Sequence, residues 1–240
     1  MFSLKRLAAP LLLCLLTATA HADEALIKKT IEAKFPDAKV KSVTKTGYAG
    51  LFEVVTEGPQ IIYADDKANY LFMGSMLDVK GQKNLTEERM QKLTAVKFDS
   101  LPFETAIKVV KGNGSRKIAV FADADCPYCK KFEQELAHVD NITVYTFLYP
   151  IDSLHPESGK KSKQIWCAPD RVKAWDDWMM KNILPKNDGN CDNPVAKTVE
   201  LAKKLGINGT PTVIFADGRR IPGMVPAAKL EQILSGNSAK

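Results

Sequence analysis

Two stretches of the chain differ in how apolar and polar residues alternate. In residues 23–82, apolar side chains recur at helical spacing as far as Phe35, and Pro36 ends the expected helix. Segments rich in β-branched and aromatic residues follow, separated by turn signals. These expected strands cover residues 39–46, 51–56, 60–64 and 69–79. The pattern predicts a small curled antiparallel sheet with one helix, whose marginal core favours pairing with a second copy.

Beyond residue 100, strands and helices alternate. The expected strands cover residues 106–110, 117–122, 142–148 and 212–215; the expected helices cover 126–138, 158–181 with a break at Pro169, 194–205 and 227–234. This order is typical of a thioredoxin-like domain with a helical insertion, which makes the whole chain α+β. The expected organisation is a signal peptide at 1–22, an N-terminal domain at 23–82, a charged linker helix at 83–100 and the thioredoxin-like domain at 101–240.

The first 22 residues have the three parts of a secretory signal. Lys5 and Arg6 precede an apolar run, and the small residues Ala20 and Ala22 suit a cleavage site. An uncleaved membrane anchor is the alternative, although the run is short for a span of roughly 20 residues. Cleavage lowers the formal charge from +6 to +4. The remaining Lys and Arg residues form no long run, so nucleic-acid binding has little support.

Four cysteines remain after the signal, an even number that in an exported chain indicates disulfide chemistry. Cys126 and Cys129 form a C-P-Y-C motif between a buried strand and a helix. Cys126 is expected to be exposed at the helix start, where free backbone N–H groups and the helix dipole favour a thiolate. Pro127 suits the first turn because it has no N–H to leave unpaired. We expect Cys126 to attack disulfides and the more enclosed Cys129 to resolve the mixed disulfide.

Two other interpretations of the motif are weaker. Half of a structural zinc site would need two further ligands at short spacing, but 23 residues separate Cys167 from Cys191, and the nearest histidines are solitary. A purely structural disulfide across so short a loop would stabilise the fold little. No metal and no cofactor are therefore expected.

The chain resembles the periplasmic disulfide isomerases of the DsbC/DsbG type over essentially its whole mature length, and is closer to DsbC. The supporting segments, in family order, are Gly74-Ser75-Met76-Leu77-Asp78-Val79, Phe121-Ala122-Asp123, Ile165-Trp166-Cys167-Ala168, Trp175-Asp176-Asp177, Leu205-Gly206-Ile207-Asn208-Gly209-Thr210-Pro211 and Pro222-Gly223. One residue departs from the pattern: Pro127 follows the first active-site cysteine, where DsbC usually has Gly.

The resemblance implies further properties. The N-terminal domain would be a cystatin-like dimerisation domain, and the protein a periplasmic homodimer. Its clients would be misfolded, disulfide-containing exported proteins, and an inner-membrane thiol reductase of the DsbD type would keep it reduced. Thr210 and Pro211 would face Cys126 as a cis-proline loop on the client-binding side, with Pro127 and Tyr128 as further contacts for clients.

The other cysteines and the acidic residues near the motif are less decisive. Cys167 and Cys191 are expected to form a structural bridge, and a second redox pair is the alternative. Asp123 is either a proton relay for Cys129 or a local cap. Asp125 would oppose thiolate formation at Cys126 by charge repulsion.

Three functions compete at this point. The first is a dimeric isomerase and reductase with chaperone activity. A DsbG-like chaperone or reductase of single-cysteine clients is the second, and a monomeric DsbA-like oxidase, which would not need the N-terminal domain, is the third. Apolar side chains at Leu51-Phe52, Ile61-Ile62 and Leu71-Phe72-Met73 are enough for both a core and a client-binding lining.

Overall fold

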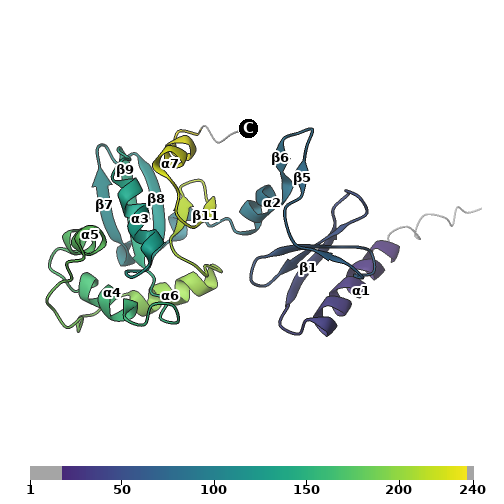
Figure 1. The fold of residues 1–240 in the computed structure, drawn as a ribbon, viewed down its shortest axis with the longest axis horizontal. Coiled ribbons are helices and arrows are strands. Elements are labelled where there is room, and N and C mark those ends of the chain that lie inside the picture. The colour runs from purple at the N-terminus through teal and green to yellow at the C-terminus, as the bar shows by residue number, and fades with distance from the viewer. Residues whose placement is uncertain (1–17, 237–240) are drawn as a thin grey trace, which may run out of the picture. The chain divides into compact units, whose positions relative to one another are not determined.

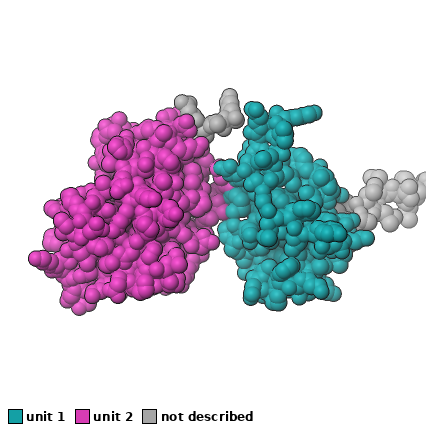
Figure 2. Space-filling model, in the orientation of Figure 1, with its two compact units in different colours: residues 1–90 teal, residues 91–240 magenta. Residues whose placement is uncertain are grey.

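The computed structural model describes residues 18–236 of the chain. The chain folds as two units, residues 1–90 and 91–240, which Figure 2 distinguishes by colour. Most of the predicted signal peptide, residues 1–17, lies outside the described residues. Within the described range, no helix combines the length and the apolar character needed to cross a membrane. The expected α+β class is confirmed.

The first unit is a helix packed on an antiparallel sheet (Figure 1). Its elements are α1 (Ala18–Lys34), β1 (Val40–Lys45), β2 (Phe52–Thr56), β3 (Ile61–Ala64) and β4 (Leu71–Phe72), and the strands pair in sequence order. Ile27 and Ile31, one helical turn apart on α1, are buried against Phe52 and Val54 of the sheet. This single cluster is the core of the unit, and β1 and β4 are the two edges of its sheet.

The strand expected over 69–79 is wrong as one element. The structure has β4 and then a separate strand β5 (Leu77–Asp78), which pairs with β6 (Lys83–Asn84). Gly74 lies between them with φ of +153°, a backbone conformation that residues with side chains rarely adopt, and it ends the first strand. Helix α2 (Leu85–Leu93) follows, and none of its residues is buried.

The segment after α2 packs into the second unit. The backbone N–H of Val96 donates to the carbonyl of Gly218 at 3.0 Å, and the side chains of Val96, Phe98 and Leu101 are buried in that unit's core. Residues 83–100, the expected linker, thus combine a helix without buried residues and a well-packed stretch.

A five-stranded sheet forms the centre of the second unit (Figure 1). Its strands, in the spatial order β11-β10-β8-β9-β7, are β7 (Ile107–Lys111), β8 (Arg116–Ala122), β9 (Ile142–Leu148), β10 (Thr212–Phe215) and β11 (Arg220–Pro222). Strands β8 and β9 are parallel, and every other pair is antiparallel. The short edge strand β11 had no expected residue range, because three residues with a terminal proline give no recognisable period.

Helices cover both faces of this sheet. They are α3 (Pro127–Leu136), α4 (Ser158–Trp166), α5 (Arg171–Lys181), α6 (Val195–Lys204) and α7 (Ala227–Leu234). Alternate residues of β8 point to opposite faces of the sheet. Ile118 and Val120 pack in a core cluster with residues of α3, whereas Ala119 and Phe121 pack in a second cluster with residues of α6. After the charged Arg116 and Lys117, the strand is apolar and buried from Ile118 to Ala122, because both of its faces are covered there.

Candidate active site

The C-P-Y-C motif lies where β8 passes through a short turn into α3. Cys126 is the N-cap of α3, and its carbonyl accepts hydrogen bonds from the N–H groups of Cys129 (3.1 Å) and Lys130 (3.2 Å). Pro127 occupies the first turn, as expected from its missing N–H. The sulfur of Cys126 is therefore at the positive end of the helix dipole.

Cys126 is strongly favoured as a thiolate. Its pKa is lowered to about 5, first by the hydrogen bond from the Cys129 thiol and further by the Thr210 side chain and the backbone N–H groups of Cys129 and Tyr128. Burial acts in the opposite direction but is the weaker effect. The expectation that Cys126 is exposed is wrong, because only 5% of the residue is accessible. The loop at Thr210 lies against the sulfur, and its carbonyl oxygen is 3.3 Å from Sγ.

Cys129 has the opposite electrostatic environment. It is 1% exposed, and burial raises the pKa of its thiol far above the ordinary value. The hydrogen bond to Cys126 and the charge of the Cys126 thiolate act in the same direction. Both cysteines are free. The structure thus holds a reduced pair in which one sulfur is ionised at neutral pH and its neighbour stays protonated.

The loop 209–211 brings Thr210 and Pro211 to the thiols across a long stretch of sequence. The Thr210–Pro211 peptide bond is cis, and Pro211 is buried. The carbonyl of Pro211 accepts from the N–H of Gly223 at 2.7 Å, which ties the loop to the chain beyond β11. On the outer side of the helix start, Pro127 and Tyr128 are exposed, Tyr128 by 58%. Of the four residues predicted to contact clients, Thr210 thus lies against the Cys126 sulfur, and Pro127 and Tyr128 follow Cys126 in the chain as exposed residues.

Asp123 holds the turn between β8 and α3. Its fully buried carboxylate accepts hydrogen bonds from the N–H groups of Asp125 and Ile151, both at 2.7 Å, and from the Ser158 hydroxyl at 2.6 Å. The sequence left a proton relay and a local cap open for this residue. In the structure, the carboxylate bonds to the turn, to the segment after β9 and to the start of α4, and one of its oxygens lies 3.1 Å from Nδ1 of His155.

Comparison with known proteins assigns this architecture to a family. The family model of the thioredoxin-like domain matches residues 103–236, and that of the disulfide bond isomerase protein N-terminal domain matches residues 18–87. A protein of Bordetella parapertussis named "probable thiol:disulfide interchange protein DsbC" is 42% identical over 205 residues, which cover 85% of this chain and 72% of the relative. The thiol:disulfide interchange protein DsbC of Escherichia coli K12 is 31% identical over 229 residues, 93% and 92% of the two chains.

The chain belongs to the DsbC family. A solved structure agrees: the disulfide interchange protein from Neisseria gonorrhoeae is 46% identical, with a TM-score of 0.55, and the match covers 58% of this chain and all of that one. The family inferred from the residues around the C-P-Y-C motif is thereby confirmed, as is the combination of an N-terminal domain with a thioredoxin-like domain.

The insertion of this DsbC-family chain, helices α4 and α5, contributes two contacts to the turn that sequence reasoning missed. The Lys161 ammonium is 2.7 Å and 2.9 Å from the two carboxylate oxygens of Asp125. The Trp178 indole N–H donates to the carbonyl of Ala124 at 2.6 Å. Neither contact leaves a periodic or motif signal, because the partners are 36 and 54 residues apart in the sequence.

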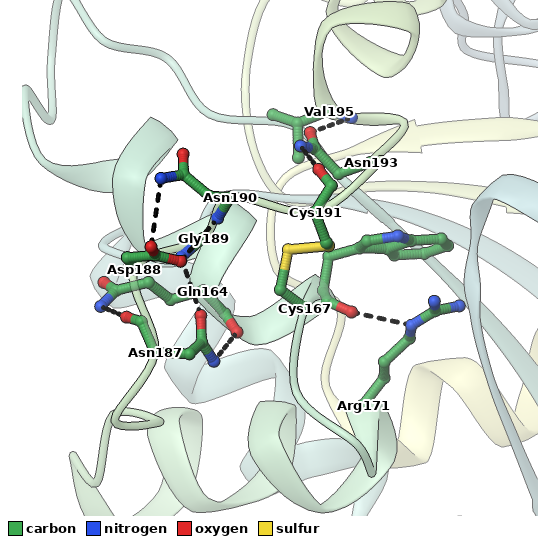
Figure 3. Close-up of a disulfide and its surroundings, with 11 residues drawn as sticks. Gln164, Cys167, Arg171, Asn187, Asp188, Gly189, Asn190, Cys191, Asn193 and Val195 are labelled. Carbon is green, nitrogen blue, oxygen red and sulfur yellow. Dashed lines mark hydrogen bonds between the residues drawn. A yellow bond between two sulfur atoms is a disulfide. The ribbon is translucent and has the colours of Figure 1, made fainter.

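The remaining cysteines are bonded to each other (Figure 3). Cys167, the C-cap of α4, forms a disulfide with Cys191, with the Cα atoms 5.7 Å apart. Asn187 pairs with the backbone carbonyl of Gln164 at 2.9 Å, which fixes the loop that leads to Cys191. With these sulfurs bonded, no group of three or more His, Cys, Asp or Glu side chains in residues 23–236 is arranged to hold a metal ion.

Proposed function

We propose that the protein is a periplasmic protein disulfide isomerase and reductase that corrects wrong disulfides in exported proteins through Cys126 and Cys129. The observation that carries the proposal is the opposite perturbation of the two thiols within one free pair. Reshuffling needs a nucleophile that is ionised at neutral pH, and a second thiol that stays protonated lets the mixed disulfide persist before it is resolved.

The reaction begins at Cys126. Its thiolate attacks one sulfur of a client disulfide, so that a Cys126–client disulfide forms and the other client sulfur leaves as a thiolate. The contact of Thr210 with the sulfur and the exposure of Pro127 and Tyr128 next to it in the chain support the assignment of Thr210, Pro211, Pro127 and Tyr128 as contacts for the client. The released client thiolate can then attack another disulfide of the same client, and the client finally displaces Cys126 with a new, internal disulfide.

Reduction is the second outcome of the mixed disulfide. The Cys129 thiol gives up its proton and attacks Cys126 Sγ; the client leaves as a thiolate and is protonated, while the enzyme keeps a Cys126–Cys129 disulfide. Two electrons must then return to the enzyme from a thiol reductase, for which an inner-membrane protein of the DsbD type is the proposed donor. The high pKa of Cys129 delays this step and gives the client time to rearrange.

A low-pKa nucleophile alone does not distinguish an isomerase from an oxidase, because a stabilised thiolate also makes the enzyme's disulfide a good oxidant. The N-terminal unit favours the isomerase: its family model is that of a disulfide bond isomerase N-terminal domain. Scrambled, fully oxidised ribonuclease tests the choice. The intact protein should restore ribonuclease activity, and Cys126→Ser should restore no more than buffer does. Equal recovery with both proteins would contradict the proposal, and recovery only from reduced ribonuclease would favour the oxidase.

A chaperone role and a homodimer are supported by apolar side chains on the first unit. Of the segments expected to be both core and lining, Phe52, Ile61 and Ile62 are buried, and only Phe72 and Met73 remain more than half exposed. Further exposed large apolar side chains in the same unit are Leu26, Phe35, Tyr48, Tyr70, Leu77 and Val79. Several of them lie on or beside β4, an edge strand of a sheet that has a small core of its own. A second copy paired along this edge would cover them.

Analytical ultracentrifugation of the mature chain, residues 23–240, tests the dimer. A dimer at micromolar concentration is expected, whereas a monomer would contradict this role for the N-terminal unit. Removal of residues 23–82 should leave a monomer that still reduces small disulfides but isomerises scrambled ribonuclease poorly. Undiminished isomerisation by the shortened protein would show that pairing is not needed.

A further inference from the structure

An acidic residue directly precedes the nucleophile. A free carboxylate at Asp125 would disfavour the negative charge on Cys126, because like charges close together raise each other's pKa. The neighbouring carboxylate, Asp123, already accepts hydrogen bonds from Ser158 and from two backbone N–H groups. Asp125 is bound differently, since its partner is the ammonium group of Lys161.

The ion pair between Lys161 and Asp125 is well shielded. Its N–O distances are 2.7 Å and 2.9 Å, and the side chains of Lys161 and Asp125 are only 23% and 18% exposed. Charges at that exposure are screened less by water and salt than a surface pair. The pair also spans a long stretch of sequence, from α4 of the insertion to the turn before α3.

Trp178 of α5 completes the arrangement. The Lys161 ammonium lies 4.9 Å from the centre of its indole ring, and Lys130 of α3 lies 4.7 Å from it. The indole N–H bonds to the carbonyl of Ala124, the residue before Asp125. One side chain therefore holds both the cation and the backbone of the turn. Lys130 donates in addition to the side-chain oxygen of Asn182, whereas the carboxylate of Asp125 is paired with Lys161.

We propose that Lys161 is a positioning residue that sets the reactivity of Cys126 by neutralising Asp125, and that this is a contribution of the helical insertion to disulfide exchange. The inference rests on the proposed assignment of Cys126 as the nucleophile. Lys161 itself need not touch the client. It acts through Asp125, and Trp178 keeps it in place.

The effect has a definite direction. Without the cation, Asp125 carries an unpaired negative charge next to Cys126, and the thiolate becomes less stable. We expect the pKa of Cys126 to rise by about half a unit to one unit, as for one like charge near a partly solvated site. The reduced form is then less favoured, and the Cys126–Cys129 disulfide becomes a weaker oxidant. A tenfold change in that equilibrium corresponds to about 30 mV.

A double-mutant cycle on the mature protein tests the proposal. The thiolate absorbance of Cys126 is titrated against pH in Lys161→Met, in Asp125→Asn and in the double variant, and the thiol–disulfide equilibrium with glutathione is measured alongside. Lys161→Met should raise the pKa and lower the reduction potential. Asp125→Asn should neither raise the pKa nor lower the reduction potential, and in its background Lys161→Met should raise the pKa much less. No rise in Lys161→Met, or the same rise with and without Asp125, would overturn the proposal.

Two matched variants separate this role from other causes. Lys160→Met removes the same charge from the adjacent, exposed position of α4 and should leave the titration unchanged. Lys161→Arg keeps a cation and should retain the low pKa. A loss of folding in Lys161→Met would appear as a changed circular dichroism spectrum and would be absent from Lys161→Arg. These measurements need no client protein. A protein without isomerase activity could therefore still show the effect of Lys161 on Cys126, so the proposed function and the proposed role of Lys161 are tested separately.

Discussion

The second unit contains two cysteine pairs, and exposure alone would identify the wrong pair as the reactive one. The free pair, Cys126 and Cys129, is 5% and 1% exposed, whereas Cys191 of the disulfide is at the surface. If access decided reactivity, the disulfide would be the reactive pair. The structure shows that local electrostatics distinguishes the pairs better, because only Cys126 is surrounded by groups that stabilise a thiolate.

The two pairs also differ in which end of a helix they occupy. Cys126 is the N-cap of α3, at the positive end of that helix dipole, and Cys167 is the C-cap of α4, at the negative end. The dipole of α3 favours a thiolate at Cys126, and the dipole of α4 opposes one at Cys167. Opening the Cys167–Cys191 bond thus yields a poorly stabilised thiolate, whereas opening a Cys126–Cys129 bond yields a well-stabilised one.

The largest expected effect is in the order of reduction. Titration of the oxidised protein with a glutathione redox buffer should open Cys126–Cys129 long before Cys167–Cys191, at reduction potentials separated by roughly 100 mV or more, which is over a thousandfold in equilibrium constant. Thiol counting after unfolding, with peptide mapping, identifies the pair that has opened. If both pairs open together, the contrast drawn from helix polarity is wrong, and Cys167 and Cys191 become a second redox pair.

Removal of the Cys167–Cys191 disulfide should lower the stability of the fold and leave disulfide reduction by Cys126 intact. The paired substitution Cys167→Ala and Cys191→Ala frees a loop with a sequence separation of 24. In the chain-entropy model this costs about 3 kcal/mol of unfolding free energy, to be measured by urea denaturation. Reduction of a small disulfide at low temperature should stay within about twofold of the intact protein. A large loss of that activity with the fold intact would show that the bridge belongs to the active site.

The role of Cys129 as a hydrogen-bond donor gives a smaller effect. Its thiol is the largest cause of the low pKa of Cys126, so Cys129→Ala, which removes the donor, should raise that pKa by about one unit. Cys129→Ser keeps a donor and should titrate closer to the intact protein while it accumulates mixed disulfides with clients. Thiolate absorbance measures both variants. Equal titration midpoints in Cys129→Ala and Cys129→Ser would mean that the α3 dipole and the Thr210 loop alone account for the low pKa of Cys126.

The comparison also shows how much of the active site can be predicted from the sequence. The strand–turn–helix context of Cys126 is local, so residue types within a few positions of it predict the N-cap and Pro127 in the first turn. The burial of the same sulfur comes from Thr210, 84 residues away, and no local pattern reveals it. Lys161 and Trp178 are equally remote from the turn that they contact.

Two further features of the structure do not follow from the sequence pattern. The segment 69–79 has strand-like composition, but the φ of +153° at Gly74 divides it. Asp123 accepts hydrogen bonds from Ile151 and Ser158, which are 28 and 35 residues away in the sequence. Composition and period therefore predict the sheet, the helices and the reactive motif, whereas contacts between distant segments determine how the motif is tuned.

The smallest expected effect concerns the link between α3 and the insertion that carries the bridge. Glu133, one turn beyond Cys129, accepts a hydrogen bond from the Trp175 indole N–H at 2.8 Å. Burial of the carboxyl group raises the pKa of Glu133 to about 7, against the opposing effects of Trp175 and of the Lys111 charge, while Asp176 adds to the rise. A carboxyl whose pKa is higher in the folded than in the unfolded state makes the fold bind more protons between about pH 4.5 and 7.

The unfolding free energy should therefore fall as pH rises through that window. Glu133→Gln keeps the acceptor for Trp175 but cannot ionise, so it should lose this part of the pH dependence and be the more stable protein above pH 7. Thermal unfolding of both proteins between pH 4.5 and 8 is the measurement, with an expected difference of a few °C at most. Parallel curves would mean that Glu133 is hydrated in solution. If Glu133→Gln also changes the pKa of Cys126, the α3–α5 contact influences the reactive pair.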